Sequence, residues 1–190
     1  MGHSQASKQA THDRIVSIAA ERFCELGIDG LSIADLMKEA GLTHGGFYKH
    51  FESRDQLVAE ALNAAFQRSD EPGRTHKASL DTLVSEYLSL EHRDSVGTGC
   101  AVGALVSDMG RIEGEAQELF TRKLKANIKG ISALLGTAEG AKRAEAIMVF
   151  SAMVGALGLS RAVADDELSQ EILSTVKSFV LNGFGPSSQG

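Results

Sequence analysis

Hydrophobic residues recur along this chain at intervals of three and four positions, the spacing of helices that bury one face. No run alternates apolar and polar residues as a half-buried strand would. We therefore expect an all-α fold. The pattern predicts longer helices over residues 11–26, 54–69, 77–93, 100–109, 114–135 and 141–164, and a final helix from residue 165.

Residues 32–54 break into two shorter helices around a tight turn. Ser32 can cap the first helix, and Gly41 can adopt the left-handed backbone that ends it. Thr43 can then cap the second helix. Two short helices around a glycine turn form a helix-turn-helix motif, whose second helix enters the major groove of DNA. With the helix at 11–26, the motif predicts a three-helix DNA-binding domain.

The second short helix carries residues suited to DNA. Gly45 and Gly46 each cost about 1 kcal/mol of helix stability relative to alanine. Such a cost makes sense where the backbone itself must approach DNA closely. Tyr48, Lys49 and His50 offer a hydroxyl, a cation and an imidazole, and these groups suit phosphate oxygens.

Residues 41–51, together with 53–57, resemble the signature of the TetR (tetracycline repressor) family of bacterial transcriptional regulators. Phe47 and Phe51 lie four positions apart and would anchor the second helix to its own domain. The resemblance implies an N-terminal DNA-binding domain, an all-helical regulatory domain, a homodimer, and release from DNA when a ligand binds. With Gly46 and Lys49 added from their chemistry, the predicted DNA contacts are Ser32, Thr43, His44, Gly45, Gly46, Tyr48, Lys49, His50 and Arg54.

The chain departs from the family pattern at two positions of this region. The family usually has a small residue where Met37 stands, which concerns packing, and often a lysine where Arg54 stands, so that the charge is kept.

The breaks between the predicted helices indicate the domain boundaries. We expect a disordered arm over 1–10, the helix-turn-helix domain over 11–54, and a ligand-binding and dimerisation domain over 55–185, followed by a tail over 186–190. Pro72-Gly73 marks a break between helices.

The last two predicted helices are apolar on more than one face and rich in small residues. A two-fold dimer that forms a four-helix bundle would cover those faces, and the family resemblance implies the same surface. The alternative is that these helices form only the core of a monomer. The predicted dimer residues are Ile147, Ser151, Val154, Gly155, Gly158, Ile172, Val176 and Phe179.

A pocket for an effector should lie between helices of the regulatory domain and be mainly apolar. Tyr87 is its best polar residue. Cys100 begins a helix after a glycine-rich loop, where a thiolate is favoured, so it is either a reactive thiol or a packing residue. The candidates are Leu62, Phe66, Leu83, Tyr87, Cys100, Leu105, Met109 and Phe120.

Composition narrows the function further. The chain has 190 residues and a formal net charge of −6, so the predicted DNA contacts form a small basic patch on an acidic protein. Its two cysteines lie in no metal-binding pattern, and we expect no zinc, no cofactor and no disulfide framework. No catalytic motif is present, which argues against an enzyme. The absence of a signal peptide and of a long apolar run predicts a cytoplasmic location away from membranes.

We therefore predict a homodimeric DNA-binding regulator, usually a repressor, released from a pseudo-palindromic operator by an unknown small effector. Two alternatives remain open. One is a redox or electrophile sensor that acts through Cys100. The other is a helical interaction or ligand-carrier protein that no longer reads DNA, which the acidic net charge favours.

Overall fold

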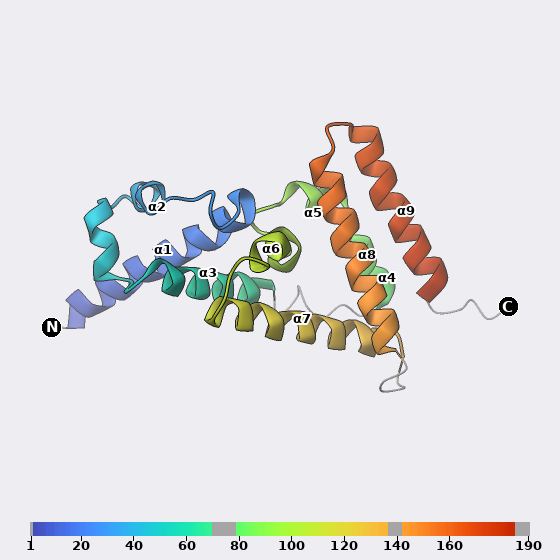
Figure 1. Cartoon of the computed structure of the whole chain (residues 1–190), viewed down its shortest axis with the longest axis horizontal. Coiled ribbons are helices and arrows are strands. Elements are labelled where there is room, and N and C mark those ends of the chain that lie inside the picture. The colour runs from blue at the N-terminus through green and yellow to red at the C-terminus, as the bar shows by residue number, and fades with distance from the viewer. Residues whose placement is uncertain (1, 70–78, 137–141, 185–190) are drawn as a thin grey trace. The chain divides into compact units, whose positions relative to one another are not determined.

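The computed structural model describes residues 2–69, 79–136 and 142–184, and within these ranges it contains helices and no strand (Figure 1). The predicted all-α fold is confirmed. The elements are α1 (Gly2–Leu26), α2 (Ile33–Glu39), the 3₁₀ helix η1 (His44–Lys49), α3 (Arg54–Ser69), α4 (Leu80–Tyr87), α5 (Leu90–Asp94), α6 (Ala101–Met109), α7 (Glu115–Leu134), α8 (Arg143–Ala162) and α9 (Asp166–Phe184).

One compact unit contains α1, α2, η1, α3, α6 and the start of α7. Helix α3 runs along α1, and α6 contacts both of them (Figure 1). The unit therefore adds α3 and α6 to the three helices of the predicted motif. Its largest fully buried side chains are Ile15, Phe23, Leu36, Met37, Phe47, Phe51, Leu57, Leu62 and Leu105.

Helix α1 begins well before the predicted start. The disordered arm expected over 1–10 is wrong for residues 2–10, which continue α1 in the N-terminal direction. Thr11, at the predicted start, lies inside the helix, and its hydroxyl donates to the Ser7 carbonyl at 2.9 Å. The Gln9 amide also donates to Asp13 at 2.8 Å. These contacts four residues apart stabilise helix in a polar segment that lacks an apolar stripe.

The helix-turn-helix is built by local signals. The Ser32 hydroxyl caps α2 by accepting a hydrogen bond from the Asp35 N–H at 3.1 Å. Gly41 has a φ of +70°, the left-handed conformation that ends the helix at little cost for glycine. Thr43 occupies the N-cap position of η1, but its side chain makes no capping hydrogen bond.

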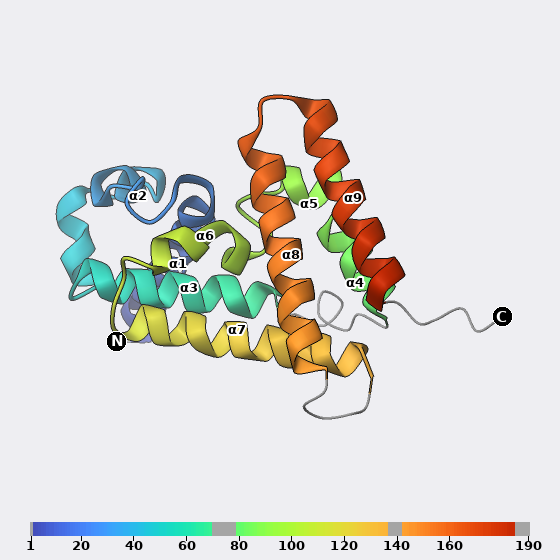
Figure 2. The same ribbon diagram turned by 45° about the vertical axis from the view of Figure 1, so that its right-hand side comes forward.

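A second compact unit contains α4, α5, the rest of α7, α8 and α9. Helices α8 and α9 lie side by side as an antiparallel pair joined by a short turn, and α4 contacts both (Figures 1 and 2). The single helix predicted over 77–93 is wrong, because the chain forms α4 and α5 instead. Ser89 starts α5 by accepting a hydrogen bond from the His92 N–H at 3.1 Å.

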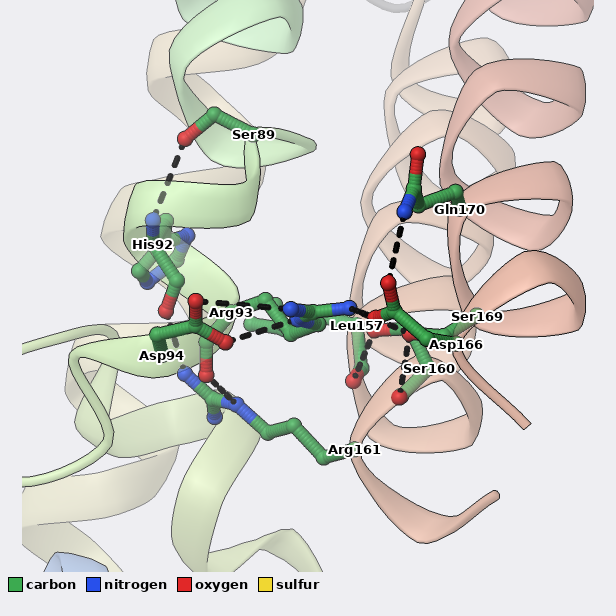
Figure 3. Close-up of polar contacts among 10 residues, drawn as sticks. All are labelled: Ser89, His92, Arg93, Asp94, Leu157, Ser160, Arg161, Asp166, Ser169 and Gln170. Carbon is green, nitrogen blue, oxygen red and sulfur yellow. Dashed lines mark hydrogen bonds and ion pairs between the residues drawn. The ribbon is translucent and has the colours of Figure 1, made fainter. Parts of the chain in front are cut away.

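Two arginines tie α5 to the α8–α9 pair (Figure 3). Arg93 donates to Asp166 at 2.7 Å and to the Ser169 hydroxyl at 3.0 Å, and it holds the pKa of Asp166 below its usual range. Arg161 donates in the other direction, to the His92 carbonyl at 2.7 Å and the Arg93 carbonyl at 2.9 Å. The buried Ser169 hydroxyl donates to the Ser160 carbonyl at 2.7 Å. These bonds satisfy polar groups where three chain segments meet.

Among the described residues, α8 is long and apolar enough to cross a membrane, but core helices of soluble proteins meet the same criterion. The predicted break at Pro72-Gly73 and the predicted tail over 186–190 lie outside the described residues.

Candidate nucleic-acid interface

The 3₁₀ helix η1 presents a polar face to solvent and an apolar face to its own domain. Thr43, His44, Tyr48 and Lys49 are exposed, and Tyr48 exposes 68% of its surface. Phe47, between them in the sequence, is fully buried. This division is what a recognition helix needs, because its outer side chains must remain available for bases and phosphates.

The two glycines of η1 leave part of that face without side chains. A Cβ atom added at Gly45 would meet nothing within 4 Å, whereas one at Gly46 would lie 3.4 Å from the Met37 methyl group. Packing within the domain therefore gives no reason for glycine at position 45. A close approach of backbone to DNA would give one.

Aromatic packing holds η1 in place. The Phe47 and Phe51 rings stack at 5.2 Å, and Tyr48 meets Phe47 edge-on at 5.3 Å. Phe51 also stacks at 4.6 Å on the His12 ring of α1. These contacts fix the direction of the exposed side chains, so that their arrangement exists before any DNA binds.

Ser32 and Arg54, the two predicted contacts on either side of the turn and η1, differ in their surroundings. Ser32 is exposed at the start of α2 and donates its hydroxyl hydrogen to Asp35 at 2.5 Å. Arg54 is half-buried and turned inward. Its Nη2 atom donates to the Ile28 carbonyl at 2.5 Å and to the Leu31 carbonyl at 2.9 Å.

His50 is the C-cap of η1 and lies among cationic residues, of which only Lys49 is among the predicted DNA contacts. Its pKa is lowered from 6.5, first by desolvation and then by His12, Lys8 and Lys49. The His12 ring lies 6.2 Å from it, and His12 contacts Glu60 of α3 at 2.5 Å. The Nδ1 atom of His50 is buried and has no hydrogen-bond partner among the described residues. His50 therefore favours its neutral form before DNA binds.

This environment predicts a pH dependence of stability. The unfolded chain protonates His50 near its ordinary pKa of about 6.5, whereas the folded domain resists protonation. Stability contributed by this residue is therefore present above pH 6.5 and is lost as the pH falls below it. Comparison of thermal midpoints between pH 7.5 and 5.5 for wild type and His50→Gln should show a smaller acid loss in the variant. Equal losses in both proteins would contradict the effect.

His12 and Lys8 belong to this surface but are not among the predicted DNA contacts. Both lie on α1, four positions apart and hence on one helix face. That spacing was readable in the sequence. Their position beside His50 was not, because it depends on how α1 meets the end of η1.

The candidate pocket residues divide between the two units. Leu83 and Tyr87 are half-buried residues of α4 in the second unit. The first unit holds the other six, of which all but the half-buried Cys100 are buried: Leu62, Phe66, Cys100, Leu105, Met109 and Phe120. The Phe66 and Phe120 rings lie 6.4 Å apart. Cys100 is the N-cap of α6, and its sulfur accepts from the Gly103 N–H at 3.5 Å.

None of the predicted dimer residues is buried in the single chain. Ser151, Gly155 and Gly158 are exposed along α8, and Phe179 on α9 exposes 74% of its surface. The buried face of α8 is instead formed by Ala146, Val149, Phe150, Met153, Ala156, Leu157 and Ser160. The predicted dimer residues are therefore not the monomer core.

Known proteins share both the sequence signature and the fold. The profile of the family described as "Bacterial regulatory proteins, tetR family" matches residues 15–61. The uncharacterized HTH-type transcriptional regulator YvdT of Bacillus subtilis is 33% identical over 94 residues. That match covers 45% of this chain and 48% of YvdT, so it spans about half of that relative.

Solved structures extend the similarity in fold along the chain. A TetR-family transcriptional regulator from Agrobacterium tumefaciens superposes with a TM-score of 0.77 at 18% identity, over 93% of this chain and 98% of that one. AibR, solved in complex with isovaleryl coenzyme A and operator DNA, superposes with a TM-score of 0.62 at 13% identity, over 93% and 99% of the two chains. The family profile thus assigns residues 15–61, from within α1 to within α3, to the TetR family of bacterial regulatory proteins, and 93% of the chain shares the fold of a solved regulator of that family.

Proposed function

We propose that the protein is a dimeric repressor that binds a pseudo-palindromic operator and leaves it when a small effector binds. Each η1 would occupy one major groove, with the two half-sites one helical turn or more apart. The contacts would come from Ser32, from the exposed residues Thr43, His44, Gly45, Tyr48 and Lys49 in and before η1, and from the half-buried Gly46 and His50.

The observation that carries this proposal is the division of η1 into a buried aromatic side and an exposed polar side. Phe47 is fully buried next to Tyr48, which is 68% exposed. A helix that served only the core would not expose a tyrosine, a lysine and a glycine together. Although the chain is acidic overall, four basic or titratable residues lie near one end of η1: Lys8, His12, Lys49 and His50. Phosphate contacts of this kind make binding salt-dependent.

The exposed apolar residues of α8 and α9 support a homodimer. Ile147, Met148, Leu159, Leu168 and Phe179 are large hydrophobic side chains that each expose 41% or more of their surface. Small residues between them allow a second helix pair to approach closely. A second copy of the chain would cover these faces and place two recognition helices on one DNA duplex.

The effector is proposed to be a small, largely apolar molecule. The candidate pocket residues of the first unit are mainly hydrophobic, with Cys100 as their polar group. AibR supports the general scheme, since a protein of this fold holds both a coenzyme A ester and operator DNA. The ligand would act by favouring a dimer geometry that no longer matches the half-site spacing. A thermal-shift screen of small apolar compounds would identify it.

The proposal is tested by selecting duplexes from a random library with the purified protein and footprinting the enriched sequences. We expect two inverted half-sites about 10 base pairs apart, or a multiple of that spacing, and binding that weakens with salt. If no sequence is enriched even at low salt, the helical carrier alternative is favoured instead.

Gly45→Ala separates DNA binding from folding. The added methyl group has open space in the free protein, and alanine favours the helix by about 1 kcal/mol, so the thermal midpoint should stay equal or rise. If the backbone meets DNA here, affinity for the selected duplex should fall about tenfold or more, equivalent to about 1.4 kcal/mol.

Gly130→Ala is the matched control, because Gly130 is an exposed glycine of α7 that also has open space around it. That variant should keep wild-type affinity. Unchanged affinity in Gly45→Ala would show that η1 does not approach DNA at this residue.

A further inference from the structure

Arg54 stands in the first turn of α3, directly after the recognition helix and its connecting residues. A cation at a helix N-terminus is unfavourable, because the partial charge of the helix is positive there. The side chain is also half-buried. The guanidinium of Arg54 therefore needs hydrogen-bond acceptors close by, and the fold of the domain supplies them.

The acceptors are two backbone carbonyls in the loop between α1 and α2. Nη2 of Arg54 donates to Ile28 O at 2.5 Å and to Leu31 O at 2.9 Å, so both hydrogens of that nitrogen are used. The Ile28 and Leu31 side chains are themselves buried, so water cannot easily replace the guanidinium. A carbonyl left without a donor at such a site is destabilising.

This loop leads directly into the helix-turn-helix. It begins at Gly27, which has a φ of +76°, and ends at Ser32, the N-cap of α2. Arg54 thus joins the residues just before α2 to the residues just after η1, and it closes the chain around the whole helix-turn-helix. Movement of either end would change the direction in which η1 points.

We propose that Arg54 is a positioning residue that clamps the helix-turn-helix from inside, and that it does not serve as a phosphate contact. This inference rests on the proposed DNA-binding function only for its effect on affinity. The clamp itself is present in the free protein. Lysine would keep the charge, and its ammonium has three N–H donors, but its side chain is shorter than that of arginine, so its nitrogen should not reach both carbonyls from the same backbone position.

Three variants distinguish a clamp from a phosphate contact: Arg54→Lys, Arg54→Met and Lys49→Met. Each is melted without DNA and then titrated with the selected duplex over a series of salt concentrations. For Arg54→Lys we expect a thermal midpoint about 2–8 °C lower. We also expect affinity about tenfold weaker, with an unchanged slope of log K against log salt, since phosphate contacts set that slope. Arg54→Met should likewise leave the slope unchanged.

Lys49→Met is the comparison, because Lys49 is exposed on η1. It should keep its midpoint, while the salt slope falls in magnitude by about 0.9 for each phosphate that the variant no longer neutralises. Wild-type stability and affinity in Arg54→Lys, combined with a reduced slope in Arg54→Met, would overturn the clamp. If Arg54→Lys fails to fold, the result supports the clamp, because a residue that only contacts DNA is not required for folding of the free protein. If the wild-type protein selects no duplex, the proposed DNA-binding function is wrong. The thermal midpoints measured without DNA still test whether Arg54 stabilises the domain.

Discussion

Replacing Phe47 with alanine is expected to destabilise the DNA-binding unit by about 3–5 kcal/mol and to abolish operator binding. The side chain is fully buried and stacks on Phe51 at 5.2 Å, so its removal leaves a cavity directly beneath η1. Whole domains are stable by only about 5–15 kcal/mol, so this change removes a large fraction of the total. Urea denaturation followed by circular dichroism measures the loss.

Tyr48→Ala is the matched control one position away. Tyr48 is 68% exposed and meets Phe47 only at the ring edge, so stability should change by about 0.5 kcal/mol or less. DNA affinity should nevertheless fall if the tyrosine contacts a phosphate. A loss below about 1 kcal/mol for Phe47→Ala would mean that the aromatic contacts do not anchor η1.

Phe179→Glu is expected to convert the proposed dimer into a folded monomer and to weaken operator binding by about 10²-fold or more. The phenylalanine exposes 74% of its surface in the single chain, so a charge there does not disturb the monomer core. In a dimer the same position would be covered, and an unpaired carboxylate would be buried at high cost. Analytical ultracentrifugation gives the oligomeric state, and titration of the two-half-site duplex gives the affinity.

Leu90→Glu provides the same chemical change outside the proposed dimer face. Leu90 begins α5 and is 43% exposed, and an acidic residue is favourable in the first turn of a helix. This variant should remain dimeric and keep its affinity. A Phe179→Glu protein that stays dimeric would place the dimer contact elsewhere on the molecule.

The helix-turn-helix could be predicted because its signals are local. Ser32 caps α2 and Gly41 takes the left-handed backbone, each as its own residue type favours. The break between α4 and α5 also had a local signal, since Ser89 at the N-cap with Glu91 in the first turn marks a helix start. Continuous apolar spacing from Leu80 to Leu90 concealed it. The helical start of α1 was missed because contacts between polar residues, rather than an apolar stripe, accompany it.

The sequence by itself determined the all-α class, the cap and turn of the helix-turn-helix, and which residues in and around η1 are suited to DNA. Only the tertiary structure decided which polar groups meet. Arg54 reaches carbonyls 23 and 26 residues earlier in the chain, and Arg93 reaches Ser169 across 76 residues. Helix periodicity reports which face of a segment is apolar, but it carries no information on the partner across the core. Arg54 therefore looked like a DNA contact in the sequence and lies inward in the folded domain, because packing of α3 against the first loop sets its direction.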